Sequence, residues 1–167
     1  MAAAWMNQRE IIVRVADLQV GTGQDVLVTV GLGSCVAVLL YDPLAKVGGL
    51  AHILLPSPAL SRQDPNAAKF PQTAIPHLMD LMAREGASPR RMTGRLVGGA
   101  SMFASLAAPG TIQMGERNVV ACRQVLYSQG IPLVSEAVGG DYGRTVKLRA
   151  SDGQVEVSSV AHGVLNI

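Results

Sequence analysis

The segment GLGSCVAVLLYDPLAKVGGLAHILLP, residues 31–56, contains one of only two cysteines and one of only three histidines in this chain of 167 residues. A glycine-rich turn leads into a nearly continuous apolar run, 35–41, and a short loop separates it from a second run, 47–55. Apolar runs bounded by turn signals are typical of strands that are covered on both faces. The segment therefore predicts two neighbouring buried strands, with the cysteine at the start of one and the histidine in the other.

Hydrophobic patterning predicts further strands and two helices outside this segment. The predicted strands are 10–15, 25–30, 95–98, 131–138, 144–150 and 154–160, and a hairpin signal, Asp152-Gly153, joins the last two. The predicted helices are 73–85 and 118–129, which begin near the capping residues Thr73 and Asn118 and end before a glycine. The polar segment 57–70 predicts a mobile surface loop.

The order of these elements favours an α+β fold. The strands and helices do not alternate regularly enough for a doubly wound parallel sheet. The chain shows no internal repeat and no low-complexity linker, and its length favours one domain spanning residues 1–167. About half of the residues, 49%, are hydrophobic, so a substantial core is expected.

Charge and composition exclude several classes of function. The formal net charge is only +2, and the arginines form no basic stripe, so we expect no nucleic-acid partner. No apolar run reaches the ~18 residues of a membrane span, and the N-terminal apolar stretch is too short for a secretory signal. We therefore expect a cytoplasmic protein without membrane insertion. The weak net charge gives no reason to expect more than a monomer. Two cysteines are too few for a disulfide framework or a multi-cysteine zinc site, so we expect no metal and no cofactor.

Cys35 has two interpretations. A free cysteine in an apolar strand is often a small packing residue. A packing cysteine would normally lie in the middle of its strand, whereas Cys35 opens its strand directly after the turn containing Gly31 and Gly33. Those glycines allow a sharp bend and leave room for a substrate near the sulfur. The position therefore favours a nucleophile.

His52 and Thr29 are candidates for the groups that would activate this cysteine. A histidine in an apolar run is often a half-buried structural residue, but paired strands would place His52 beside Cys35, where an imidazolium lowers the pKa of a thiol. Thr29 ends the strand before the glycine turn, and its hydroxyl or carbonyl group could accept the second imidazole N–H. An ordinary strand threonine is the alternative for Thr29. We expect the turn at Gly33 and Ser34, through the N–H groups of Ser34 and Cys35, to stabilise an oxyanion.

The remaining histidines and the second cysteine receive no catalytic role. His77 lies on the first predicted helix and is expected at its solvated side, and His162 lies in the C-terminal tail. Cys122 falls on the apolar face of the second helix and is expected to be a packing residue. The glycine pairs 21–23 and 31–33 lack the third glycine and the following helix of a dinucleotide-binding fingerprint, so that function is rejected.

The segment around Cys35 resembles the signature of CheD, the family of chemoreceptor glutamine deamidases of bacterial chemotaxis. The family pattern is roughly T-x-G-L-G-S-C-V…D…G…A-H-x-x-L-P. It is matched by Thr29, Gly31–Val36, Asp42, Ala51, His52, Leu55 and Pro56. The similarity continues at 73–75, 98–103, 115–118 and 139–144, and so covers most of the chain in order. One departure is Pro71-Gln72, where the family commonly has an acidic residue.

The resemblance implies a function and a set of site residues. In the family, the matching cysteine, histidine and threonine form a papain-like triad, which implies Cys35, His52 and Thr29 here. The implied substrates are glutamine side chains of methyl-accepting chemotaxis receptors, and the CheC phosphatase is a further implied partner. The implied fold is a layered β-sheet sandwich with flanking helices, similar to that of a glutamine-deamidating toxin domain.

Two alternatives remain open at this stage. A non-catalytic interaction module that binds CheC or the receptors would contain the same segments. A peptidase or an amidase of small substrates would use the same attacking atoms and differ only in its substrate groove. Reactivity of the Cys35 thiol would separate the first alternative from an enzyme, and the identity of the substrate would separate the second.

Overall fold

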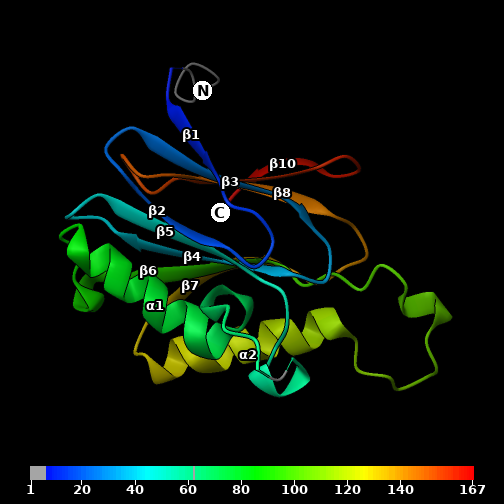
Figure 1. The fold of residues 1–167 in the computed structure, drawn as a ribbon. Helices are drawn as coiled ribbons and strands as arrows, with labels where there is room; N and C mark the ends of the chain where they lie inside the picture. Colours follow the sequence, from blue (N-terminus) through cyan, green and yellow to red (C-terminus); the bar gives the residue numbers. More distant parts are fainter. Residues whose placement is uncertain (1–6, 62) are drawn as a thin grey trace.

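The computed structural model describes residues 7–61 and 63–167, which form two mixed β-sheets and two α-helices arranged in three layers (Figure 1). The first sheet has the order β1 (Arg9–Ile12), β3 (Asp25–Leu32), β8 (Arg144–Arg149), β9 (Val155–Ser159) and β10 (Gly163–Asn166). The second sheet has the order β2 (Leu18–Thr22), β5 (Val47–Ile53), β4 (Val36–Asp42), β6 (Thr93–Gly98) and β7 (Leu133–Val138). The α+β prediction is confirmed.

Most neighbouring strands are antiparallel, and each sheet has one parallel pair at an edge. β1 is parallel to β3 in the first sheet, and β6 is parallel to β7 in the second. Two short strands, β2 and β10, were not predicted. Both lie at a sheet edge, and β10 is exposed along its whole length, so neither shows a clear hydrophobic pattern.

The second sheet is the middle layer, with the first sheet on one face and both helices on the other (Figure 1). Every residue of β4 and β5 is buried, as the apolar runs predicted. Alternate residues of β4 belong to two different cores: Val36, Val38 and Leu40 face the helices, whereas Ala37 and Leu39 face the first sheet. The segment 31–56 therefore contributes residues to both of these cores.

Helix α1 (Pro71–Arg84) begins two residues before the predicted start. Pro71 occupies the first turn, where its missing N–H costs nothing, and Phe70 is the N-cap residue without a side-chain hydrogen bond. Thr73 does not cap the helix, because its hydroxyl donates to the Ala67 carbonyl at 2.6 Å and lies 3.3 Å from the Phe70 carbonyl. Gly86 follows the helix with φ +97°, the left-handed conformation expected after a helix end.

Helix α2 (Met114–Ser128) also begins earlier than predicted, and Asn118 lies within it instead of at its cap. Among the described residues, no helix combines the length and the apolar character needed to cross a membrane.

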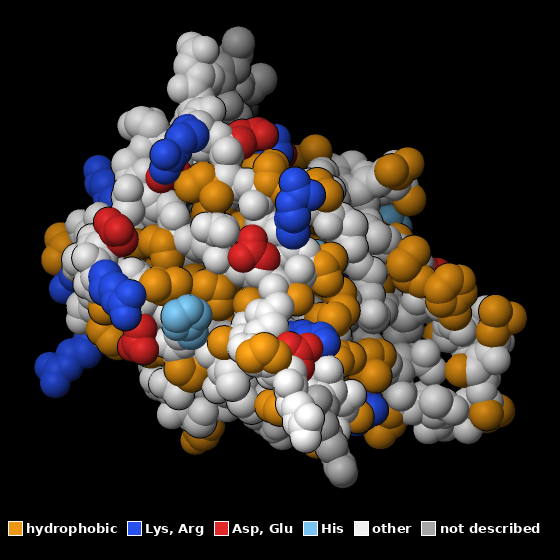
Figure 2. All heavy atoms as spheres, in the orientation of Figure 1, with side chains coloured by type: hydrophobic (Ala, Val, Ile, Leu, Met, Phe, Trp, Pro, Cys, Tyr) orange, Lys and Arg blue, Asp and Glu red, His pale blue; other side chains and the backbone are white. Residues whose placement is uncertain are grey.

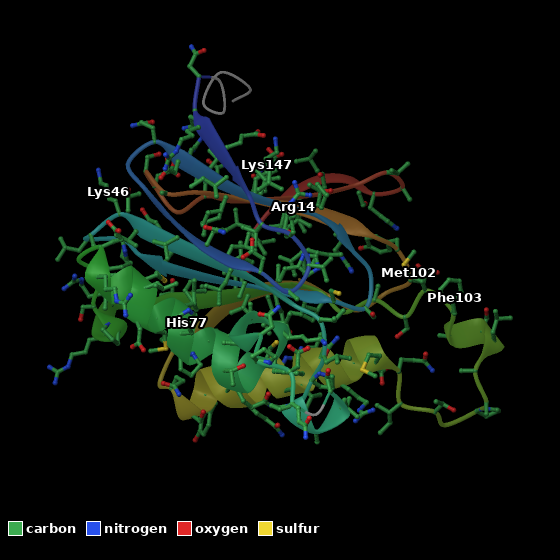
Figure 3. The ribbon with its side chains drawn as sticks, viewed as in Figure 1. Arg14, Lys46, His77, Met102, Phe103 and Lys147 are labelled. Atoms are coloured by element: carbon green, nitrogen blue, oxygen red, sulfur yellow. The ribbon has the colours of Figure 1, made fainter. Side chains whose placement is uncertain are left out.

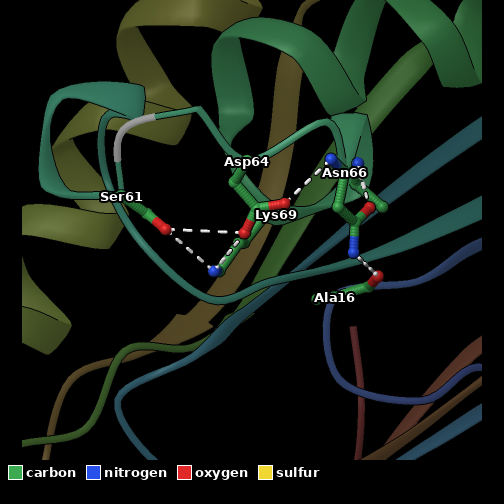
Figure 4. A network of polar contacts seen from close by, with 6 residues as sticks. Ala16, Ser61, Asp64, Asn66 and Lys69 are labelled. Atoms are coloured by element: carbon green, nitrogen blue, oxygen red, sulfur yellow. Dashed lines mark hydrogen bonds and ion pairs between the residues drawn. The ribbon is translucent and has the colours of Figure 1, made fainter.

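The segment 57–70 contains more structure than the predicted loop. Two short 3-10 turns, Pro58–Leu60 and Ala67–Lys69, are linked by a network of polar contacts (Figure 4). Lys69 Nζ lies 2.5 Å from the Asp64 carboxylate and donates to Ser61, and Asn66 donates to the Ala16 carbonyl at 3.0 Å. The prediction of an irregular loop is therefore wrong for these two turns. Arg62 lies outside the described residues.

Candidate active site

Cys35 and His52 lie at the same end of the β4–β5 pair and on the same face of the second sheet. His52 is directly opposite Ala37, two residues after Cys35. Because alternate residues of a strand point to one face, all three side chains face the first sheet. Cys35 and Ala37 belong to the core between the two sheets. Such diagonal neighbours have Cα atoms about 7–8 Å apart, close enough for their side chains to interact.

Thr29 approaches this pair from the other sheet. It lies on β3, is fully buried, and its hydroxyl oxygen is 2.7 Å from His52 Nδ1. The same hydroxyl donates to the carbonyl oxygen of Val13 at 2.5 Å. Contacts between the two sheets therefore orient the imidazole ring, and two segments of the first layer take part.

The contacts of Thr29 determine which imidazole nitrogen carries the proton. A hydroxyl group has one hydrogen, and here that hydrogen is donated to the Val13 carbonyl, which can only accept. The oxygen of Thr29 must then accept from His52 Nδ1–H. In the neutral ring His52 Nε2 is consequently the unprotonated nitrogen. It is buried and has no hydrogen-bond partner within the described part of the chain.

The main chain of His52 is held as firmly as its ring. His52 N–H donates to the Asp17 carbonyl at 2.9 Å, and Ala16 N–H donates to the His52 carbonyl at 3.0 Å. The Ala16 carbonyl accepts from Asn66 of the polar network (Figure 4). The chain after β1 and the segment 57–70 thus support the position of His52.

The Cys35–His52 pair differs from the prediction in its charge. Burial raises the pKa of the Cys35 thiol, and its own backbone N–H only partly opposes this. Burial lowers the pKa of His52 from 6.5 to about 4. The prediction of an ionised sulfur beside an imidazolium is wrong for this state, because burial disfavours both charges and no charged side chain among the described residues compensates either ion. At neutral pH the structure holds a thiol and a neutral imidazole.

The turn before Cys35 is held through its carbonyl groups. The Gly33 carbonyl accepts from Ala100 N–H at 2.8 Å, and the Cys35 carbonyl accepts from Gly99 N–H at 2.8 Å. Gly31 has φ +73°, so it provides the predicted bend. Gly33 does not leave open space, since a Cβ there would lie 3.1 Å from the Met102 sulfur.

Ser34 is exposed, whereas Cys35 directly after it keeps 9% of its accessible surface. The sulfur-bearing residue therefore lies at the rim of the core, one residue from the surface.

Asn118 is a residue of this region that sequence reasoning missed. It is fully buried, and its Nδ2 donates to the Ser34 carbonyl at 2.9 Å and to the Leu54 carbonyl at 3.2 Å. Its position in the predicted helix cap concealed this role, because a capping asparagine and a bridging asparagine look the same in a sequence. Gly98 also supports this region, since a Cβ on it would collide with the Cys35 carbonyl.

A pocket of about 310 Å³ lies beside the Cys35 turn and is lined by Ser34, Met102, Phe103 and Gln113, among others. The connection between β6 and α2 that forms one wall carries exposed apolar side chains. Met102 and Phe103 lie on this connection beyond the end of the sheets (Figure 3). Apolar side chains gather on the projecting part of the molecule at the right of the view (Figure 2).

The other candidates lie away from this site. His77 is exposed on α1 (Figure 3), and His162 is exposed and stacks on Tyr142 with ring centroids 4.0 Å apart. Cys122 is fully buried in the core between α2 and the second sheet, as expected for a packing residue. Within the described residues, no group of three His, Cys, Asp or Glu side chains could hold a metal ion.

Comparison with known proteins identifies relatives over nearly the whole chain. The chain is 44% identical over 159 residues to the probable chemoreceptor glutamine deamidase CheD of Caldanaerobacter subterraneus, covering 95% of this chain and 98% of the relative. It is 42% identical to the protein of the same description from Clostridium novyi, with the same coverage.

A crystal structure of a Neisseria meningitidis protein of the DUF152 family has the same fold, with a TM-score of 0.53 and 12% identity over 84% of this chain and 68% of that one. The model of the family described as CheD chemotactic sensory transduction matches residues 54–159. Together with the identity to full-length relatives, this match shows that the chain belongs to the CheD family.

Proposed function

We propose that this protein hydrolyses the side-chain amide of glutamine residues in chemoreceptors, releasing ammonia and leaving glutamate. The names of its relatives supply the substrate class. The observation that carries the proposal is the state of His52: Nδ1 is tied to Thr29, and Nε2 is left as an unpartnered acceptor on the face that carries Cys35. A neutral imidazole with a free nitrogen, on the sheet face that carries a thiol, can take the proton of that thiol, as nucleophilic catalysis by cysteine requires.

The first half of the reaction forms a thioester. Cys35 Sγ attacks the carboxamide carbon while its proton passes to His52 Nε2. His52 then donates that proton to the departing nitrogen, the carbon–nitrogen bond breaks, and ammonia leaves. Because both groups are neutral before the substrate arrives, the proton moves as the sulfur–carbon bond forms, and the enzyme does not store a thiolate.

The oxyanion of the tetrahedral intermediate needs donors at the Cys35 turn. The backbone N–H groups of Ser34 and Cys35 are the candidates, since each stands next to the nucleophile and the carbonyls of this turn are engaged elsewhere. Loss of one donor of this kind typically lowers the rate by about 10²–10³-fold.

The second half of the reaction releases glutamate. A water molecule gives its proton to His52 Nε2 and attacks the thioester carbon. The carbon–sulfur bond breaks, the sulfur regains that proton from His52, and the γ-carboxyl group leaves and releases its own proton to water. Thr29 keeps the ring in the same orientation through both halves, because His52 Nδ1–H is donated to it throughout.

The surroundings of the site support a protein substrate. The pocket beside Ser34 opens against a wall that exposes Met102 and Phe103, whose exposed fractions are 50% and 73%. Exposed apolar side chains beside a reactive group suit contact with another protein better than contact with a free amino acid. The proposal includes action in the cytoplasm as a monomer, binding to the CheC phosphatase, and a likeness to the glutamine-deamidating toxin fold.

The test compares the wild type with Cys35→Ala on a cytoplasmic chemoreceptor fragment. Mass spectrometry of the fragment reads the conversion of amide to acid at each glutamine, and an ammonia assay reads the leaving group. We expect conversion with the wild type and a loss of at least about 10⁴-fold in Cys35→Ala, because removing a nucleophile typically costs that much. Cys122→Ala is the matched control and should retain activity, since Cys122 is buried in the other core.

Retained activity in Cys35→Ala would refute the proposal. Binding of the fragment without conversion by the wild type would favour the interaction module, for which the exposed segment beside Ser34 is the supporting observation. Cleavage of the backbone in place of the side-chain amide would indicate a peptidase.

A further inference from the structure

Asn118 joins the two chain segments that carry Cys35 and His52. It lies in α2, which is beneath the second sheet (Figure 1), and its carboxamide reaches the end of the strand pair where β4 begins and β5 ends. One hydrogen of Nδ2 is donated to the Ser34 carbonyl and the other to the Leu54 carbonyl, at 2.9 and 3.2 Å. Ser34 precedes Cys35 by one residue, and Leu54 follows His52 by two.

The bond to Ser34 fixes the direction of the Cys35 N–H. The Ser34 carbonyl and the Cys35 N–H belong to one planar trans peptide, so the two groups point in opposite directions. Because Asn118 holds the carbonyl on the helix side, the N–H is directed to the opposite side. That N–H lies close to the sulfur of Cys35, where it opposes the effect of burial on the pKa of the thiol.

Among the described residues, only Asn118 donates a side-chain hydrogen bond to any of the three carbonyls of Gly33, Ser34 and Cys35. The carbonyls of Gly33 and Cys35 are held by backbone N–H groups of Ala100 and Gly99, which remain whatever side chains are present. The Ser34 carbonyl accepts from a side chain, so a single substitution can release it. The peptide whose N–H points at the sulfur is thus the one that depends on Asn118.

We propose that Asn118 is a positioning residue that sets the oxyanion-binding orientation of the Ser34–Cys35 peptide and holds the Cys35 turn in register with the end of the His52 strand. It does not touch the substrate, because it is fully buried. The proposal rests on the proposed function for its effect on catalysis, but the orientation of the peptide can be measured without a substrate.

The experiment uses Asn118→Leu, which keeps the size of the side chain and removes both donors, and Asn118→Asp as a second variant of nearly the same shape. Leu126→Ala is the control, since Leu126 is buried near the other end of α2 and its truncation destabilises the helix packing without touching the turn. All variants are made in the Cys122→Ala background, so that Cys35 is the only thiol. Assays are run at a temperature at which circular dichroism shows each variant to be folded.

Two readouts separate positioning from stability. We expect kcat on the receptor fragment to fall about 10²-fold in Asn118→Leu with KM changed less than about threefold, as for loss of an oxyanion donor. We also expect the pH midpoint of Cys35 alkylation by iodoacetamide to move to higher pH, because the N–H no longer supports the developing thiolate. Leu126→Ala should lower the melting temperature and leave both kcat and the alkylation midpoint unchanged.

The outcomes distinguish the two proposals. An unchanged kcat and an unchanged alkylation midpoint in both Asn118 variants would overturn the positioning role while leaving the deamidase proposal intact. Equal losses in Leu126→Ala would also overturn it, since the effect would then be one of stability. If the wild type shows no deamidation, the proposed function fails, and a shift of the alkylation midpoint in Asn118→Leu would still support the orientation of the peptide.

Discussion

Asp42 lies at one end of the β4–β5 pair, and His52 and Cys35 lie near the other. Asp42 and His52 are both fully buried, yet their surroundings differ. The Asp42 carboxylate accepts from the N–H groups of Leu44, Ala45 and Ser88 and from the Arg91 guanidinium. His52 has a single side-chain hydrogen bond, at Nδ1, and its Nε2 has none among the described residues.

The two pKa values express this difference. Burial alone would raise the pKa of Asp42, but the hydrogen bonds from Arg91 and the three backbone N–H groups lower it to about 2. Burial lowers the pKa of His52 to about 4, and no charged group among the described residues opposes this shift. One end of the strand pair thus stabilises a charge, and the other end keeps a base uncharged. A buried polar atom without a partner is costly, and a catalytic role is one reason for which a protein retains such an atom.

The largest expected effect is on catalysis at the His52 end. His52→Gln should lower deamidation of the receptor fragment by about 10⁴-fold, because the proposed general base is removed. Its melting temperature should stay close to that of the wild type, since an uncharged polar side chain of similar length replaces another. Initial rates of ammonia release and a thermal melt measure the two quantities. Residual activity within tenfold of the wild type would contradict the assignment of His52 as the base.

The next effect concerns stability at the Asp42 end. Asp42→Asn should lower the free energy of unfolding by about 3 kcal/mol. Arg91 loses its charged partner, and the NH2 group of the new carboxamide faces N–H groups that donate to the carboxylate in the wild type. kcat should change less than about threefold for the folded enzyme. Urea denaturation and steady-state kinetics on the same preparation test both statements. A large loss of kcat with an unchanged free energy of unfolding would contradict this assignment, because Asp42 would then serve catalysis and not stability.

A smaller loss is expected at Thr29, which orients the ring. Thr29→Val keeps the shape but leaves His52 Nδ1–H and the Val13 carbonyl without partners, so kcat should fall about 10²-fold. Thr29→Ser keeps the hydroxyl and should remain within about fivefold of the wild type. Equal activity of the two variants would show that the hydrogen bonds of the Thr29 hydroxyl do not orient His52.

The smallest expected effect is a pH dependence of stability. The unfolded His52 binds a proton near pH 6.5, whereas the folded one does so only near pH 4, so the unfolded state holds more protons between these values. The free energy of unfolding should therefore fall as the pH falls, by about 2 kcal/mol between pH 7 and pH 5. The contribution of Asp42 is lost only at lower pH, as the pH falls from 3.8 through about 2.

Urea denaturation at each pH measures this dependence. His52→Gln is the control and should lack the decrease between pH 7 and pH 5. An unchanged slope in that variant would show that another group titrates in this range.

Some elements could be predicted from local pattern because one segment alone contains the signal. The strands around Val38 and Leu50 appear as apolar runs, since both of their faces are buried. The hairpin at Asp152-Gly153 appears as a dipeptide, and Gly153 indeed has φ +76° between β8 and β9. The edge strands β2 and β10 could not be predicted, because a strand that buries little surface has little pattern.

The amino-acid sequence by itself determined that two buried strands follow one another, with His52 in the second and Cys35 at the glycine turn before the first, although that strand begins at Val36 and not at Cys35 as predicted. Strand periodicity then brings the two side chains to one face. Only the tertiary structure decided the tautomer of His52, the directions in which burial shifts the pKa values of His52 and Cys35, and the contacts of Asn118. These depend on the Val13 carbonyl, on a helix more than eighty residues beyond the turn, and on the exclusion of water between packed sheets, none of which a local pattern encodes.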